Sequence, residues 1–369
     1  MATLLDAVSA GWRAQDGKSS QVSYAGNLVT ILLGAWLVAG LMVDAWAHQN
    51  LARLETFFTP WHAMFYSGFL ATAGWIIWLV SRRVRAERNW AAIPRGYRLG
   101  LVGIATFGVG GIGDMLWHII FGIEKNIAAL LSPTHLLLFL GGMLILTTPL
   151  RAEWGAPGSP AERRSLRQFL PALLSIALAT TLTTFITMYV WAFTHRAPFY
   201  TQGTQYYVAS GFGELTQVVG VADILWSNVV LMAPVLLLLR RWRLPFGSVT
   251  LLFVLTTTLM EVPVEFHTYE NVVVALLVGL VADGLIAALR LSPGSGTGAY
   301  RAFAMLVPLL LWGGYMLAGQ LRYGLAWSPE LWAGAIVLTS LSGLGVSLLL
   351  TAGDAIPASS STSPALPRS

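Results

Sequence analysis

The chain of 369 residues contains no cysteine and very little charge. Without cysteine it has no disulfides, iron–sulfur clusters or thiolate metal sites, so a metal ion would have to bind to His, Asp, Glu or Met. Charged residues make up only 11%, against roughly 25% in soluble domains, whereas hydrophobic residues make up 56% and the mean hydropathy is +0.66. This composition excludes a soluble domain, a disordered chain, a coiled coil and a secreted disulfide-rich protein.

Several motifs of nucleotide and hydrolase chemistry are also missing. The sequence has no Walker phosphate-binding loop, no Gly-rich dinucleotide fingerprint after a strand and no Ser-His-Asp nucleophile elbow. Their absence argues against ATP-driven transport and against hydrolysis of the soluble type. The net charge of +5 does not indicate nucleic-acid binding, because the basic residues are spread over short loops between apolar runs rather than over one face.

Apolar runs of about 20 residues, the length of a membrane-spanning helix, recur along the whole chain. We therefore predict an all-α, polytopic transmembrane bundle in a lipid bilayer, with about ten spans. The expected spans cover roughly residues 27–48, 60–81, 99–120, 133–150, 169–194, 218–239, 245–262, 270–290, 301–320 and 330–351. Residues 1–26 are expected to be a cytoplasmic lead-in, 27–352 the transmembrane bundle, and 353–369, rich in Ser and Pro, a disordered tail.

The distribution of Lys and Arg predicts how the bundle is oriented. With the N-terminus in the cytoplasm, 18 of the 22 basic residues fall in the lead-in, the tail and the loops on the cytoplasmic side. The other four, Arg53, Lys125, Arg196 and Arg322, fall one in each of four outer loops. This split follows the positive-inside rule and predicts an even number of spans, with both termini cytoplasmic, in the cell (inner) membrane.

All six histidines fall near the outer ends of the expected helices. They are His48, His62, His118, His135, His195 and His267. A shared site on the outer face would explain this one-sided placement, because ionisable residues within membrane-spanning segments are typically functional. His195, in the segment WAFTHRAPFY, is instead interpreted as an interfacial residue.

An internal repeat contains four of these histidines. In the first copy, Asp44 and His48 lie four residues apart at the end of one expected helix, which places both side chains on one helical face. After a connecting loop, Thr59 suits an N-cap and Pro60 the first helical position, so His62 falls in the first turn of the next helix. One carboxylate and two imidazoles are therefore expected at similar depth.

The second copy has the same arrangement. Asp114 and His118 are again four residues apart at a helix end, and Ser132 and Pro133 again begin the next helix two residues before His135. Each hairpin thus offers three ligands suited to copper, zinc or iron, with a coordination position left for water or substrate. The alternative interpretation is a duplicated capping device with a hydrogen-bonded Asp-His pair at the interface.

Both connecting loops contain one glutamate, Glu55 in the first and Glu124 in the second. We expect these two carboxylates to orient the neighbouring imidazoles. Two weaker patterns suggest an outer polar vestibule. Asp223 begins DILWSN, which repeats DMLWH with serine in place of histidine, and the segment MEVPVEFHTYE brings together Glu261, Glu265 and His267 around a proline.

The Asp-x3-His pattern followed by Thr-Pro-x-His resembles the metal-site motif of the C subunit of the particulate methane and ammonia monooxygenases, membrane proteins in which an Asp-His-His set binds copper. The matching residues are Asp44, His48 and His62 in the first hairpin, next to the segment FFTPWH, and Asp114, His118 and His135 in the second. The resemblance covers about 20 residues in each copy, and the rest of the chain does not match that subunit. It implies copper sites and favours oxidative chemistry.

Three classes of function fit these patterns. The first is a copper protein of the membrane with outer-face sites, acting as an oxidative enzyme or as a subunit of a larger membrane oxidase complex. The second is a secondary transporter or metal/proton permease, in which Asp223 and the deeper Asp283 carry protons or ions. The third is a non-catalytic membrane scaffold or sensor. Stoichiometric, redox-active metal would distinguish the first class from the second.

Overall fold

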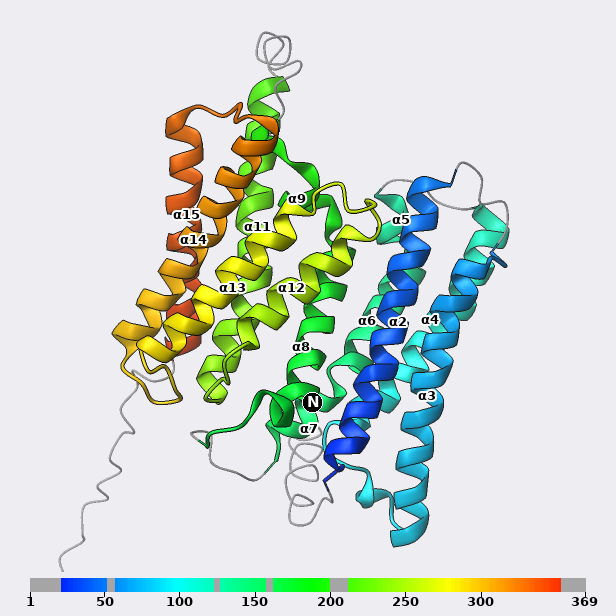
Figure 1. Cartoon of the computed structure of the whole chain (residues 1–369). Helices are drawn as coiled ribbons and strands as arrows, with labels where there is room; N and C mark the ends of the chain where they lie inside the picture. The colour runs from blue at the N-terminus through cyan, green and yellow to red at the C-terminus, as the bar shows by residue number, and fades with distance from the viewer. Residues whose placement is uncertain (1–20, 52–56, 123–126, 157–161, 200–211, 353–369) are drawn as a thin grey trace, which may run out of the picture.

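The computed structural model describes residues 21–51, 57–122, 127–156, 162–199 and 212–352. Within these ranges every regular element is a helix and none is a strand, in agreement with the predicted all-α class (Figure 1). Most of the expected lead-in and all of the expected tail, 353–369, lie outside the described residues.

Eight helices of the described part are long and apolar enough to cross a membrane. They are α2 (Tyr24–Asn50), α3 (Pro60–Glu87), α4 (Tyr97–Phe121), α8 (Leu166–Ile186), α11 (Phe212–Arg241), α13 (Glu270–Ala288), α14 (Thr297–Tyr323) and α15 (Pro329–Thr351). Each of them overlaps one of the expected spans. The chain is therefore an integral membrane protein by the length and composition of its helices.

Two of the ten expected spans differ from single straight helices, so the count of ten is not confirmed. The fourth is broken into α6 (Pro133–Leu146) and α7 (Thr148–Trp154), which are bent by 41°. The bend is consistent with Pro149 in the first turn of α7, because proline cannot continue an α-helical hydrogen-bond ladder. The Arg151 side chain stabilises the break by donating to the Leu144 carbonyl at 2.6 Å and to the Gly96 carbonyl at 3.1 Å.

The other exception is α12 (Ser248–Glu261), whose 14 residues are too few for a span. At 1.5 Å per residue such a helix is about 21 Å long, against about 30 Å for the hydrocarbon core. The fifth expected span also ends early, at Ile186, and the chain continues through short helices. These are η2 (Met188–Val190), α9 (Ala192–His195) and η3 (Ala197–Phe199); η1 (Trp90–Ala92) and α5 (Ala128–Leu131) lie in other connections.

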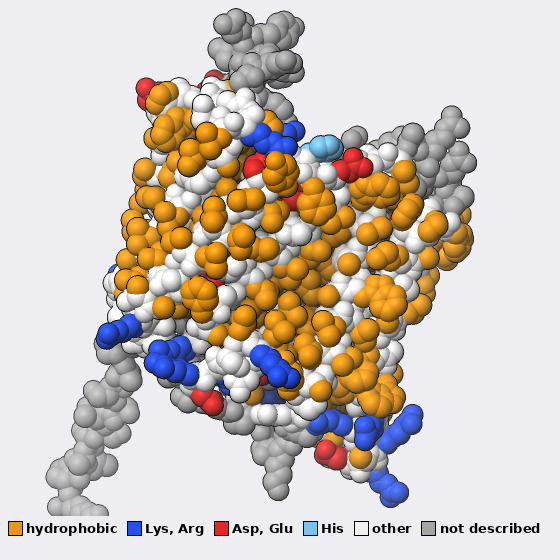
Figure 2. All heavy atoms as spheres, viewed as in Figure 1, with side chains coloured by type: hydrophobic (Ala, Val, Ile, Leu, Met, Phe, Trp, Pro, Cys, Tyr) orange, Lys and Arg blue, Asp and Glu red, His pale blue; other side chains and the backbone are white. Residues whose placement is uncertain are grey.

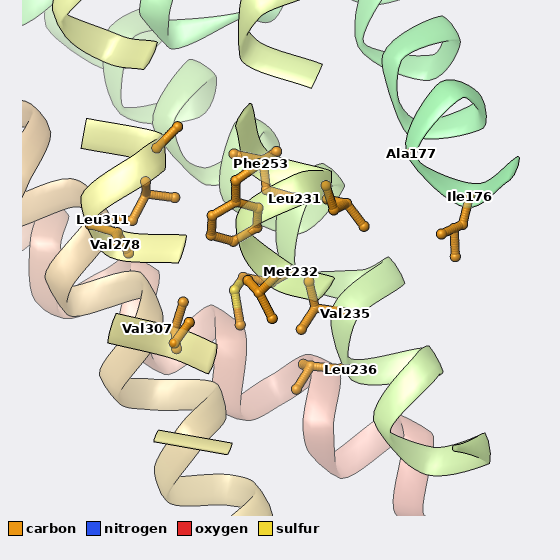
Figure 3. Close-up of a cluster of buried hydrophobic side chains, with 14 of the residues drawn as sticks. Ile176, Ala177, Leu231, Met232, Val235, Leu236, Phe253, Val278, Val307 and Leu311 are labelled. Carbon is orange, nitrogen blue, oxygen red and sulfur yellow. The ribbon is translucent and has the colours of Figure 1, made fainter. Parts of the chain in front are cut away.

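Helix α8 lies between two groups of helices (Figure 1). On one side are the hairpins α2–α3 and α4–α6, and on the other are α11 to α15. The larger core joins α8 to the second group, and its members include Ile176 and Ala177 of α8, Leu231 and Met232 of α11 and Phe253 of α12 (Figure 3). A smaller core fills the space within the two hairpins. The cavity described below lies between these hairpins and α8.

Glycines let the two helices of each hairpin approach closely, and they stand at matching positions in both hairpins. In each hairpin one glycine lies four residues before the Asp of the ligand set, and these are Gly40 and Gly110. A second glycine lies six residues after the His that begins the second helix, and these are Gly68 and Gly141. A Cβ at each would meet the partner helix backbone, at 2.7 Å for Gly40 (Phe65 Cα) and Gly68 (Leu37 Cα), 3.0 Å for Gly110 (Leu138 N) and 2.6 Å for Gly141 (Phe107 N). The two hairpins are therefore packed in the same way.

Charge is distributed unequally between the two ends of the bundle. Arginines gather at the lower edge in Figure 2, below a wide apolar belt. Of the arginines in the described residues, Arg196 and Arg322 lie at the upper end, beside the Tyr323 ring. The histidines of the two hairpins lie at this same end, where α2 ends and α3 begins and where α4 ends and α6 begins.

Candidate metal centre

The first Asp-His-His set forms where α2 ends and α3 begins. Asp44 and His48 lie one turn apart in the last turns of α2. The Thr59 hydroxyl caps α3 by accepting from the backbone N–H of His62 at 3.1 Å, and so fixes His62 in the first turn. Asp44 Oδ2 then lies 3.7 Å from Nε2 of His48 and 3.7 Å from Nε2 of His62.

The second set is built by the same means at the end of α4 and the start of α6. The Ser132 hydroxyl accepts from the backbone N–H of His135 at 3.3 Å and caps α6. Asp114 Oδ1 lies 3.4 Å from Nε2 of His118 and 2.9 Å from Nε2 of His135. In both sets the expected convergence of one carboxylate with two imidazoles is observed.

Two of the imidazoles are oriented through their Nδ1 atoms. His118 Nδ1 lies 3.3 Å from the Gly122 carbonyl oxygen, which can only accept, and this contact turns Nε2 toward Asp114. His62 Nδ1 lies 2.9 Å from the Thr59 hydroxyl. Metal-binding histidines are commonly held in this manner, with the second ring nitrogen bonded to a backbone or side-chain oxygen.

The two sets are neighbours at the upper end of one cavity of about 1300 Å³. The ring centroids of His62 and His118 are 6.3 Å apart, and Phe57 stacks on His62 at 4.9 Å while lying 6.0 Å from His118. Tyr66, one turn after His62, donates from its hydroxyl to Asp114 Oδ2 at 3.1 Å. A side chain of the first hairpin thus orients the carboxylate of the second.

The two carboxylates have different surroundings. Asp114 accepts from the Tyr66 hydroxyl and, at 3.3 Å, from the Thr134 hydroxyl. Asp44 Oδ1 is buried and has no hydrogen-bond partner among the described residues. Because a buried unsatisfied carboxylate oxygen is costly, this atom is available for a cation.

The spacing of the first set fits metal coordination, whereas in the second set Asp114 Oδ1 lies 3.4 Å from His118 Nε2 and at hydrogen-bond distance, 2.9 Å, from His135 Nε2. Two ligands each about 2.1 Å from one ion are roughly 3.0–4.2 Å apart, and the 3.7 Å separations around Asp44 fall in this range while being too long for hydrogen bonds. Within each set, one ligand atom from every residue lies within 4.8 Å of the others. Apolar helices and buried His/Asp groups together fit a membrane protein that binds metal.

The remaining residues predicted from the sequence lie elsewhere. Glu55 and Glu124 fall outside the described residues. Glu261 accepts from the Thr268 backbone N–H at 3.1 Å and hydroxyl at 2.6 Å, which closes the turn after α12. Glu265 accepts from the Trp46 indole at 3.1 Å, and the His267 side chain is exposed. Neither glutamate nor His267 is among the residues that line the cavity.

Asp223 is paired with a histidine that the sequence did not link to it. Its Oδ2 lies 2.9 Å from Nδ1 of His195, and its Oδ1 is buried without a hydrogen-bond partner in the described part of the chain. His195 lines the same cavity as the two sets, whereas it was expected to be only interfacial. One feature of the sequence pointed to this pair. The segment DILWSN has serine where the two repeat copies have histidine, and in the structure the imidazole beside Asp223 comes from His195 of α9.

Asp283 has a structural role that the sequence also did not indicate. Its carboxylate accepts from the backbone N–H of Val249 at 3.0 Å and of Thr250 at 3.1 Å, and from the Thr250 hydroxyl at 2.6 Å. These are donors of the first turn of α12. Asp283 therefore caps the N-terminus of a neighbouring helix, a structural role that accounts for its burial without an ion path.

Comparisons with protein-family models, with curated proteins and with solved structures find no match to this chain.

Proposed function

We propose that this chain is a membrane metalloprotein whose two Asp-His-His sets hold a pair of metal ions in one cavity, with copper preferred and an oxidative function. One observation carries the proposal: in each set a single carboxylate oxygen lies within 3.7 Å of two imidazole Nε2 atoms. Asp44 Oδ1, buried without a hydrogen-bond partner among the described residues, adds an acceptor that a cation would satisfy.

The choice of copper rests on the donor chemistry and on the motif. Imidazole and carboxylate ligands suit copper(II), and copper has the highest affinity in the divalent first-row series, although the same donors also accept zinc and iron. The motif resemblance to the copper-binding C subunit of the particulate monooxygenases favours copper over the other two. An oxidative role follows from a redox-active metal beside a large cavity.

We further propose that the centre faces the outside of the cell (inner) membrane and that both termini are cytoplasmic. The gathering of arginines at the opposite end of the bundle supports this orientation, since Lys and Arg are enriched on the cytoplasmic side. The matching glycine contacts of the two hairpins support their interpretation as an internal repeat. A repeat explains why two similar ligand sets stand side by side.

The test is the metal content of protein purified without chelators. We expect about two copper ions per chain and a copper(II) signal that disappears on reduction. The double variant His62→Ala, His135→Ala should lose most of the metal, whereas the matched control His267→Ala, an exposed histidine outside the cavity, should keep it. Full metal content in the folded double variant would refute the assignment of the sites, and equal uptake of zinc without a redox signal would refute the oxidative role.

A further inference from the structure

The cavity below the two ligand sets is apolar and deep. On α2 its lining runs from His48 down to Leu37, and on α6 it runs from His135 to Leu146. Each of these stretches covers about 16 Å at 1.5 Å per residue. Leu37 stands near the middle of α2, so the cavity extends from the outer end of the bundle about halfway along a membrane-spanning helix.

The polarity of the lining changes along this depth. Below Asp44 on α2, the lining residues are Leu41, Val38 and Leu37. Below His135 on α6, they are Leu138, Phe139, Gly142 and Leu146, and α8 contributes Leu182. The polar lining residues, including His195 and Gln49, are all near the outer end. An apolar cavity of this kind does not hold ordered water, because water needs two to four polar partners.

We propose that the cavity binds a linear single-chain amphiphile, with its polar end group at the metal pair and its hydrocarbon chain pointing toward the membrane interior. This inference rests on the proposed function, since the metal pair is what the end group would contact. An extended chain advances roughly 1.2 Å per bond, so a depth of about 16 Å accommodates about a dozen carbons. We assign a single chain because the apolar lining residues of α2, α3, α4, α6 and α8 belong to one undivided cavity.

A substitution at Gly142 can fill the deep part of the cavity with a larger side chain, because Gly142 lines it. A Cβ at Gly142 would lie 3.0 Å from Leu182 Cδ2 and 4.0 Å from Phe107 Cε2, so a larger side chain there enters the space between α4, α6 and α8. The matched control is Gly74 on α3, which is exposed and where a Cβ would meet nothing within 4 Å.

The experiment uses dodecanoic acid with a diazirine on its last carbons, added to the full chain in nanodiscs. After photolysis we expect crosslinks on the peptides containing Leu146 and Leu182, suppressed by excess unlabelled dodecanoate. Gly142→Leu should reduce this labelling about tenfold, the effect of excluding roughly two methylenes, and Gly74→Leu should not change it. In the unmodified protein, the corresponding octanoic acid probe should label near Phe139 instead, which tests the depth without any substitution.

Labelling spread evenly over the lipid-facing helices, or labelling at Leu182 that dodecanoate does not suppress, would overturn the inference. So would a two-chain phospholipid that copurifies in stoichiometric amount and blocks the probe. The measurement is made on metal-free and on copper-loaded protein. Depth-dependent labelling without metal binding would contradict the proposed function and the contact of the end group with a metal pair, but not the binding of the hydrocarbon chain. Metal binding without labelling would contradict only the amphiphile.

Discussion

Tyr66 of α3 donates a hydrogen bond to Asp114 of α4, and this contact joins the two hairpins at the candidate centre. It also makes the two ligand sets unequal, because Asp44 has no corresponding donor on Oδ1 among the described residues. Phe139 stands at the matching position of the second hairpin, one turn after His135, and has no hydroxyl. The carboxylate of the second set is therefore fixed by hydrogen bonds, and the carboxylate of the first set is held less firmly.

The variant Tyr66→Phe tests this difference. Removing the hydroxyl should lower the affinity of one of the two metal positions by roughly 10- to 100-fold, as is typical when an outer hydrogen bond to a ligand is lost. Copper titration would detect this as the separation of one binding step from the other. The control Tyr300→Phe removes a buried hydroxyl that donates to Leu236 at 3.0 Å, far from the cavity, and should leave both steps unchanged. Equal affinities in Tyr66→Phe and the unmodified protein would contradict the role of Tyr66.

The structural role of Asp283 predicts a loss of stability without a loss of metal. Asp283→Asn replaces one accepting oxygen by an amide that cannot accept from Thr250, and should lower the free energy of unfolding by about 1–3 kcal/mol. Thermal unfolding in nanodiscs, followed together with copper content, checks both parts. If the variant keeps its stability but loses metal or transport of protons, Asp283 belongs to an ion path instead of a helix cap.

The close glycine contacts within the two hairpins predict that one substitution in each hairpin lowers the stability of the protein by a similar amount. Gly68→Ala and Gly141→Ala would each press a Cβ against partner backbone, at 2.7 Å from Leu37 and 2.6 Å from Phe107. Each should destabilise the protein by about 1–3 kcal/mol through overpacking. Gly74→Ala, with open space around the new methyl group, is the control. A neutral effect of either hairpin variant would show that the close packing is not needed there.

The orientation of the bundle is testable with single cysteines, because the natural chain contains none. Ala86→Cys at the end of α3 and Glu330→Cys at the start of α15 are both exposed and lie at opposite ends of the bundle. In intact cells a membrane-impermeant thiol reagent should label only Glu330→Cys, as the positive-inside rule predicts. Labelling of Ala86→Cys alone would place the metal centre on the cytoplasmic side.

Local sequence rules were sufficient for the geometry within each ligand set. The four-residue spacing of Asp44 and His48 and the Thr59-Pro60 helix start depend only on helical periodicity and capping, and both are present in the structure. The hairpin of Asp114 follows by the same rules. Hydropathy likewise located the eight long helices, because each of them contains a long apolar stretch.

The contacts that bring the two ligand sets together depend on tertiary packing, so the spacing of residues along the chain could not predict them. Nothing local places Tyr66 beside Asp114, or His195 of α9 beside Asp223 of α11, because each pair joins helices separated along the chain. Hydropathy also did not reveal the break between α6 and α7, since the two helices together pass as one apolar stretch and the bend depends on Pro149 and on the Arg151 contacts. The role of Asp283 as a cap for α12 is invisible for the same reason.

The most direct test of the account is the electron paramagnetic resonance spectrum of the chain loaded with two equivalents of copper(II). If both sets are occupied in one cavity, the two ions are close enough to interact, and the spectrum should be broadened or partly silent. The single variants His48→Ala and His135→Ala, each of which removes a ligand from only one set, should give the spectrum of one isolated copper(II) ion. Two sharp, non-interacting signals, or no protein-bound copper at all, would contradict the central claim.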